Sequence, residues 1–138
     1  MRFMFFLLLT VALSASCKKD QLSNANEPLV GIWRHTQTST ENQGLTDIPK
    51  LKQETWRIYN NGTLKIFRNG ILRRTETWQR DTISFLGAYD PSTGHFETIL
   101  KPALRTSHMG TVVLNQSGDQ FALITDYIDG ANYYFERQ

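Results

Sequence analysis

Short loops that end in glycine constrain the fold of this chain more than any other feature of its sequence. Three of them have the form x-[Asn/Asp]-Gly, at Asn60-Asn61-Gly62, Arg68-Asn69-Gly70 and Ile128-Asp129-Gly130. Glycine adopts the left-handed conformation that the third position of a three-residue hairpin loop requires. Apolar and polar residues alternate on both sides of each loop. The loops therefore predict antiparallel hairpins.

The alternation also predicts how the strands pair. Residues directly opposite in an antiparallel pair share a face, so an apolar side chain should lie opposite another apolar side chain. No segment with the length and periodicity of a helix separates the strands, which excludes a parallel sheet. With three-residue loops the predicted pairs are Trp56–Ile66, Ile58–Leu64, Ile66–Leu72, Phe67–Ile71, Thr125–Tyr133 and Leu123–Phe135.

The full pattern predicts an all-β domain over residues 29–138, a small antiparallel meander β-barrel of eight to nine strands. Ser39–Leu51 contains Gly and Pro without apolar periodicity. We predict a long loop there, with at most a short turn of helix, of the kind that often forms a lid or binding loop. The nine predicted strands are Leu29–Thr38, the two strands flanking Gly62, Ile71–Gln79, Thr82–Gly87, Gly94–Lys101, Met109–Gln116, Gln120–Tyr127 and Ala131–Arg137.

The first 28 residues have a different character. Residues 1–16 combine a positive Arg2, an apolar run from Phe3 to Leu13 and small residues at 14–16. This is the organisation of a secretory signal peptide, and the run is too short to span a membrane as a stable helix. Residues 17–28 begin with Cys17, are otherwise polar apart from Leu22 and Ala25, and end at Pro28. They predict a flexible tether.

Cys17, the only cysteine of the chain, follows the small residues directly. This arrangement resembles the lipobox of bacterial lipoproteins, and Cys17-Lys18-Lys19-Asp20 resembles the mature start of Bacteroidetes-type lipoproteins. The resemblance implies acyl chains such as palmitate on Cys17 and a place in the outer membrane, facing the periplasm or the surface. The alternative is an ordinary signal peptide that leaves a free thiol, a liability in an oxidising compartment.

Charge and chemistry-bearing residues exclude several function classes. The net charge of +2 is too small and too dispersed for nucleic-acid binding. His35, His95 and His108 share no metal-ligand spacing, the carboxylates are scattered singly, and no serine lies in a nucleophile elbow. We therefore predict a protein that is not an enzyme and that needs neither a metal nor a cofactor.

One hairpin carries several basic residues, and two interpretations of it are open. The cluster either binds anions or lipid headgroups, or it is a solvated strand face whose charges discourage edge-to-edge pairing. We favour the solvated face. The cluster consists of Lys65, Arg68, Arg73 and Arg74, with Arg80 beyond them.

An apolar stripe along the predicted hairpins supplies the candidate interior. These side chains either line a cavity for a small ligand or fill the barrel, because eight strands leave an interior just wide enough for side chains or one small ligand. The candidate lining residues are Trp56, Ile58, Leu64, Ile66, Leu72, Trp78, Leu123 and Phe135.

Two short motifs carry a resemblance to a known family. Gly31-Ile32-Trp33 resembles the Gly-x-Trp motif that opens the first strand of lipocalins, and Thr125-Asp126-Tyr127 resembles their Thr-Asp-Tyr motif. The resemblance implies a meander barrel in which Trp33 closes one end, packed near the last strand. It also makes Arg137 the candidate for a cation–π cover over Trp33.

These observations together predict a lipid-anchored lipoprotein of the cell envelope with a lipocalin-like barrel. Its expected role is to bind or carry a small hydrophobic or amphipathic ligand, with the Ser39–Leu51 loop over the open end. The alternative is a filled barrel that acts as a protein–protein interaction or accessory module in the envelope. Its expected partners are the membrane, through the anchor, and either that ligand or an envelope protein.

Overall fold

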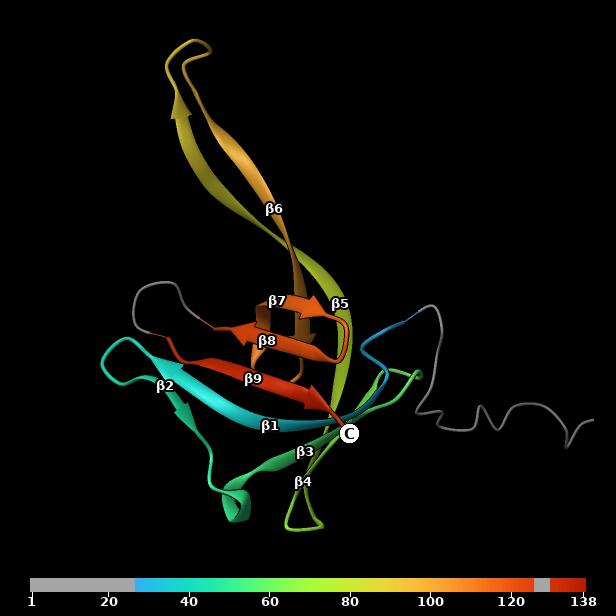
Figure 1. The fold of residues 1–138 in the computed structure, drawn as a ribbon. Coiled ribbons are helices and arrows are strands. Elements are labelled where there is room, and N and C mark those ends of the chain that lie inside the picture. Colours follow the sequence, from blue (N-terminus) through green and yellow to red (C-terminus); the bar gives the residue numbers. More distant parts are fainter. Residues whose placement is uncertain (1–26, 126–129) are drawn as a thin grey trace, which may run out of the picture.

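The computed structural model describes residues 27–125 and 130–138, and these residues form one antiparallel sheet (Figure 1). Neighbouring strands follow one another along the chain almost throughout, as in a meander. A short 3-10 helix, Lys50–Lys52, is the helical element of the described chain. The strands are β1 (Gly31–Thr40), β2 (Gly44–Asp47), β3 (Glu54–Ile58), β4 (Thr63–Arg68), β5 (Ile71–Asp90), β6 (His95–Thr106), β7 (Gly110–Ser117), β8 (Gln120–Ile124) and β9 (Asn132–Arg137).

The sheet closes on itself where the last strand meets the first. β1 pairs with β9, which places Trp33 opposite Arg137 and Ser39 opposite Asn132. The pairing makes β1 and β3 to β9 a ring of eight strands, to which β2 is added at the distal end of β1. The predicted all-β antiparallel meander is confirmed, and the closed ring is consistent with a meander β-barrel.

The hairpin at Gly62 has the predicted register. Trp56 lies opposite Ile66 and Ile58 opposite Leu64, while Gly62 has a φ of 82°. The glycine therefore supplies the left-handed conformation on which the prediction depended.

The hairpin at Gly70 differs from the prediction. Phe67 lies opposite Leu72, because the loop contains only Asn69 and Gly70, both with positive φ (53° and 75°). Two left-handed residues form the type I′ turn, which connects strands without a third loop residue. A bulge follows, so that Ile66 faces Arg74. The predicted Ile66–Leu72 and Phe67–Ile71 pairs are wrong, and the Leu72 side chain is 48% exposed.

The last hairpin keeps the predicted faces but not the predicted partners. Leu123 lies opposite Tyr133, and Phe121 lies opposite Phe135. The predicted Leu123–Phe135 and Thr125–Tyr133 pairs are therefore shifted by two residues, because β8 ends at Ile124 and a longer connection follows. A shift of two leaves every side chain on its predicted face.

The strands predicted on either side of Arg80-Asp81 are one continuous strand, β5. It pairs with β6 from Trp78 opposite Thr106 out to Asp90 opposite His95, without a break at Arg80. The irregular connection predicted after Lys101 is part of β6, and Pro102 lies opposite Thr82. The distal part of this pair projects from the ring, and we call residues 82–102 the arm (Figure 1).

The predicted loop Ser39–Leu51 is mostly regular structure. β1 continues to Thr40 and pairs with β2, where Thr38 lies opposite Thr46. The predicted short turn of helix is present at Lys50–Lys52. The segment follows the C-terminal end of β1 (Figure 1), whereas Trp33 lies near the start of that strand. Leu45 and Leu51 are exposed to 59% and 79%.

Several predictions concern residues outside the described part of the chain. They are the signal peptide over 1–16, the lipid attachment at Cys17, the tether up to residue 26, and Asp126 and Tyr127 of the second motif. Thr125 is described, and its hydroxyl donates to the carbonyl of Ala131 at 2.7 Å.

Candidate functional site

The predicted lining residues pack against one another in the interior of the ring. Seven of the eight belong to a single buried cluster, with Leu72 the exception. Aromatic rings dominate its centre: the Phe135 ring lies 4.6 Å from Trp56 and 4.4 Å from Phe121, measured between centroids. The seven side chains are at most 9% exposed, and they are Trp56, Ile58, Leu64, Ile66, Trp78, Leu123 and Phe135. Of the two alternatives for the interior, this packing favours the filled one.

Trp33 closes one end of the ring. Its side chain is fully buried, its indole N–H donates to the carbonyl of Leu29 at 2.7 Å, and its ring meets Phe121 edge-on at 4.7 Å. The guanidinium carbon of Arg137 lies 4.2 Å from the Trp33 ring centroid. The cation–π cover that the resemblance implied is therefore present.

Arg137 also binds residues 27–30, which precede β1 and which we call the entry segment. Its guanidinium donates to the carbonyl oxygens of Val30, at 3.2 Å, and Pro28, and it forms an ion pair with Asp119 at 3.1 Å. A Cβ atom on Gly31 would overlap Nη1 of Arg137. The glycine of the Gly-x-Trp motif is therefore needed because the arginine occupies the space of a side chain.

His35 lies two residues beyond Trp33 and faces the same interior. Its ring stacks on Phe135 at 4.9 Å and contacts Tyr133 at 5.4 Å, and one ring nitrogen lies 3.1 Å from the hydroxyl of Thr38. Burial lowers the pKa of His35, an effect that the charge of Glu54 and a backbone hydrogen bond at Gln37 oppose only in part. His35 is therefore an interior side chain whose burial favours the neutral form.

The lowered pKa predicts that His35 makes the domain less stable in mild acid. Above the unfolded pKa of about 6.5 both states hold a neutral imidazole. As the pH falls below it, the unfolded chain takes up the proton first, so the folded state loses stability until its own pKa is passed. We expect the wild type to lose more free energy of unfolding than His35→Phe between pH 7.5 and pH 5, measured in urea. His95 is exposed, so His95→Asn is the control and should lose as much free energy of unfolding as the wild type. Equal losses in the wild type, His35→Phe and His95→Asn would contradict the prediction.

Glu76 is an interior charge that the sequence analysis missed. It is 5% exposed and lies opposite Leu64, on the face that also carries Trp78. Its Oε1 atom lies 2.7 Å from Nε of Arg74, an ion pair, although neither carboxylate oxygen accepts a well-aligned hydrogen bond within the described residues. Its spacing of two residues from Trp78 was the available signal, but a single acid in a strand is usually solvated.

Four of the five basic residues predicted as a cluster contact other groups of the domain, whereas Arg73 is exposed. Arg68 Nη2 lies 2.8 Å from Glu54 Oε1 in an ion pair, and Lys65 Nζ lies 5.1 Å from the centroid of the Tyr59 ring. Arg80 pairs with Glu27 at 2.8 Å. Burial alone would raise the pKa of Glu27, but hydrogen bonds from Arg80 and the Leu29 N–H, with the charge of Arg80, hold it below its usual range. These pairs favour the interpretation of the cluster as a solvated strand face over that of an anion-binding site.

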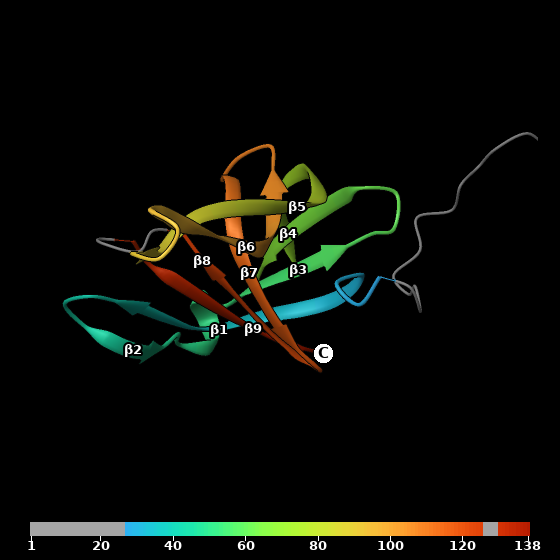
Figure 2. The same ribbon diagram turned by 90° about the horizontal axis from the view of Figure 1, so that it is seen from above.

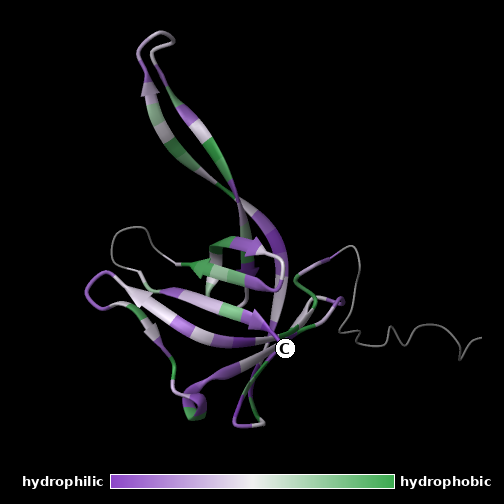
Figure 3. Ribbon diagram, in the orientation of Figure 1, coloured by the Kyte–Doolittle hydropathy of each residue, from purple (hydrophilic) through white to green (hydrophobic). Residues whose placement is uncertain are grey.

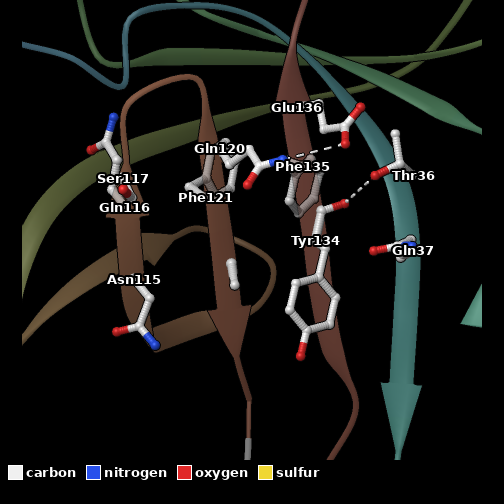
Figure 4. A pocket seen from close by; sticks show the side chains of 11 residues that line it. Thr36, Gln37, Asn115, Gln116, Ser117, Gln120, Phe121, Tyr134, Phe135 and Glu136 are labelled. Atoms are coloured by element: carbon white, nitrogen blue, oxygen red, sulfur yellow. Dashed lines mark hydrogen bonds between the residues drawn. The ribbon is translucent and has the colours of Figure 1, made fainter. Parts of the chain in front are cut away.

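A groove of about 260 Å³ lies across β7, β8, β9 and β1 (Figure 4). Most of its side chains lie on the face of the sheet opposite the core, because they alternate with Leu114, Phe121 and Phe135. Amides and hydroxyls line it, and two hydrogen bonds of 3.5 Å cross it, from Thr36 to the Tyr134 carbonyl and from Gln120 to Glu136. The lining combines these polar groups with Phe121, Ala122 and Phe135, and the groove opens on the outer face of the sheet rather than into the predicted interior.

The arm carries the largest group of exposed apolar side chains in the described chain. β5 and β6 pair with Leu86 opposite Thr98, and with Tyr89 opposite Phe96. These residues share one face with Leu100, the face that continues the interior side of the ring beyond Trp78 and Leu104. Apolar stretches run along both strands of the arm (Figure 3). The exposed fractions are 78% for Leu86, 67% for Leu100, 56% for Phe96 and 55% for Tyr89.

The composition of this face distinguishes it from an ordinary solvated strand face. It contains Thr82, Ser84, Leu86, Tyr89, Phe96, Thr98, Leu100 and Pro102, none of them charged. The rings of Tyr89 and Phe96 meet edge-on at 5.2 Å. At the tip, Ser92 donates two hydrogen bonds to the carboxylate of Asp90, at 2.8 and 2.6 Å, and these lower the pKa of that group. The arm therefore presents an uncharged face on a hairpin with a well-defined turn.

The base of the arm shelters a small apolar recess of about 170 Å³. Ile83 and Phe85 form one wall, on the face of the arm opposite the uncharged one. Val113 and Ile124 form the other, with threonine hydroxyls at the margin. Val112 of the interior cluster also borders the recess, which includes none of the predicted lining residues.

The described residues hold no group of three or more His, Cys, Asp or Glu side chains that could bind a metal ion. His35 lies in the interior, whereas His95 and His108 lie on β6 and in the turn after it. Within residues 27–125 and 130–138, no helix is long and apolar enough to cross a membrane.

Comparison with known proteins leaves the family open. No protein-family model, curated protein or solved structure matches this chain. The resemblance to lipocalins and to Bacteroidetes-type lipoproteins therefore stays a prediction.

Proposed function

We propose that this protein is a lipid-anchored, non-enzymatic module of a bacterial cell envelope that binds a protein partner through its arm. The observation that carries the proposal is the uncharged face of the arm, where four large apolar side chains remain more than half exposed. A surface of this kind on a projecting element is typical of a site for protein association. The packed interior supports the same choice over a ligand carrier.

The anchor half of the proposal rests on the sequence. The apolar run, the small residues and Cys17 favour lipidation and the outer membrane as the location, and residues 17–28 favour a tether. Glu27 and Pro28 are held by Arg80 and Arg137, so the tether proper is residues 17–26, which would reach at most about 35 Å when extended. The first described residues and the tip of the arm lie on opposite sides of the domain in both views (Figures 1 and 2). A tether at that position would leave the arm free to meet a partner.

A test of the anchor is fractionation of cells that express the full chain. The wild type should incorporate labelled palmitate and sediment with membranes, whereas Cys17→Ser should do neither. Palmitate label on the Cys17→Ser protein, or an unlabelled wild type, would contradict the anchor.

A test of the arm is the size of the complex that contains the full chain after mild detergent extraction. Leu86→Ser combined with Leu100→Ser should shift the protein to the size of a monomer, because it replaces the two most exposed leucines of the arm. Leu45→Ser, an exposed leucine on β2, is the control and should leave the complex unchanged. Circular dichroism checks that all variants fold. A complex that survives the double substitution would contradict the role of the arm.

A small apolar ligand is the second candidate, and the recess at the base of the arm favours it. The recess is smaller than the 300 to 1,000 Å³ of typical ligand sites, so it would accept only a small molecule or the end of a longer one. An apolar fluorescent probe should gain signal on binding the wild type and lose it with Val113→Glu. A wild type that gives no signal would argue against this candidate.

A further inference from the structure

The arm has an open strand edge as well as an exposed face. β6 pairs with β5 along one side over its whole length, but with β7 only from Ala103 to Thr106. The outer side of residues 95–102 therefore has no partner strand among the described residues. An open edge of this kind offers backbone N–H and C=O groups to another strand.

The sequence of that edge is self-complementary in charge. It reads Glu97-Thr98-Ile99-Leu100-Lys101, with an acid and a base at equal distances from Ile99. When two copies pair antiparallel about Ile99, Glu97 of each lies opposite Lys101 of the other. Opposite charges directly across an antiparallel pair stabilise it, and like charges destabilise it.

The charge pattern also selects one register. A shift of two residues in one direction places Glu97 opposite Ile99, and a shift in the other direction places it opposite Ala103, so that both charge pairs are lost. In this register Pro102 of one copy lies opposite Phe96 of the other, at the end of the paired segment. Pro102 has no N–H to donate to a neighbouring strand. The match is therefore confined to one arrangement, which has the two-fold symmetry of most protein dimers.

The outer edge of β5 is a poorer candidate for the same role. β5 carries a bulge between Leu86 and Tyr89, where two of its residues face Glu97 alone. Bulges twist an edge and interrupt its pairing. The bulge therefore lies on β5 rather than on β6. A Cβ atom on Gly87 would lie 2.9 Å from Cδ1 of Ile99, so Gly87 shares a face with Ile99.

We infer that the outer edge of β6 pairs with the same edge of a second copy of this chain, which makes the protein a two-fold dimer through its arms. The pairing extends each arm into a four-stranded sheet and sets Leu100 beside Thr98 of the other copy on the uncharged face. Lys101, which lies 5.6 Å from the centroid of the Phe85 ring, keeps its charge on the same face as Glu97. The inference rests on the proposed role of the arm and names its partner.

Charge reversal on the full chain tests the pairing. Two copies with different C-terminal tags are co-expressed, and their co-purification reports the dimer. Glu97→Lys should reduce co-purification at least tenfold, because two lysine side chains then face each other in each pair, and Lys101→Glu should do the same with two acids. The double variant Glu97→Lys/Lys101→Glu should restore it. A Glu97→Lys copy co-expressed with a Lys101→Glu copy should also co-purify, because every facing pair is then opposite in charge.

A disulfide across the two-fold axis is the second measurement. Ile99→Cys places two sulfur-bearing side chains directly opposite, within reach of a disulfide, and should give a dimer band on a non-reducing gel. Leu86→Cys, an exposed position on β5, should not, and the wild type controls for Cys17.

The outcomes separate this inference from the proposed function. Wild-type copies that fail to co-purify, or a Glu97→Lys chain that still does, would overturn the dimer. If the complex nevertheless depends on Leu86 and Leu100, the partner is a different protein and the proposed role of the arm stands. Loss of the complex in the single reversals, with recovery in the double variant, supports the dimer.

Discussion

Replacing Trp33 with alanine is expected to lower the free energy of unfolding by about 4 kcal/mol, which is the range for large aromatic truncations in a core. Trp33 is fully buried and packs against Phe121 and the guanidinium of Arg137. The substitution leaves a cavity and removes the hydrogen bond to the Leu29 carbonyl. Urea denaturation at low temperature measures the loss.

Trp33→Phe is the matched control for this substitution. It keeps a ring against Phe121 but loses the indole N–H, so we expect a cost of about 2 kcal/mol. Leu51→Ala, at a side chain 79% exposed, should change stability by less than about 0.5 kcal/mol. If Trp33→Ala proves no more harmful than Trp33→Phe, the side chain does not close the ring as described.

Gly31→Ala is expected to cost about 2 to 3 kcal/mol, for two reasons that can be separated. The φ of Gly31 is 151°, a conformation that alanine adopts with strain of about 1 to 2 kcal/mol. The new methyl group would also displace the Arg137 guanidinium. Because that group is the end of a flexible side chain, it can move, but it then loses its contacts with Trp33, Val30 and Pro28.

A double-mutant cycle with Arg137→Ala isolates the second reason. Arg137→Ala alone should cost about 1 kcal/mol through the lost cation–π contact and hydrogen bonds. In Gly31→Ala/Arg137→Ala the displaced group is absent, so the two costs should sum to more than the double variant shows. Strictly additive costs, measured by urea denaturation of all four proteins, would mean that the methyl group does not act through Arg137.

The parts of the fold that depend on alternation could be predicted from the sequence. Period-two patterning specifies which face a residue joins, and Leu123 and Phe135 lie on the predicted face even though their partners are shifted by two. Turn geometry is less well specified. Asn69-Gly70 fits a two-residue or a three-residue loop, and only the structure distinguishes them. The prediction placed Leu72 in the interior because it assumed the three-residue loop, whereas the two-residue loop places it opposite Phe67.

The arm was missed for a different physical reason. Gln79, Arg80 and Asp81 are three consecutive polar residues between two segments with alternating apolar residues, and such a polar stretch is typical of a turn. In the structure Arg80 is instead held by Glu27, from the entry segment far away in sequence, and Asp81 by Arg105 across the hairpin. Long-range pairs of this kind have no local signal. The candidate docking surface therefore depends on a strand that sequence patterning divides in two.

Closure of the ring by β1 and β9 has a consequence for the order of folding. The guanidinium of Arg137 meets the Val30 carbonyl across 107 positions of sequence, and the N–H of Gln138 donates to the Ile32 carbonyl at 2.9 Å. Until the last residues arrive, β1 lacks its second neighbour and Trp33 lacks its cover. Long-range pairing of this kind slows folding. In a chain that leaves a translocation channel amino end first, the ring would therefore stay incomplete until the final residues emerge. During that interval the chain would depend on factors that protect open strand edges in the compartment it enters.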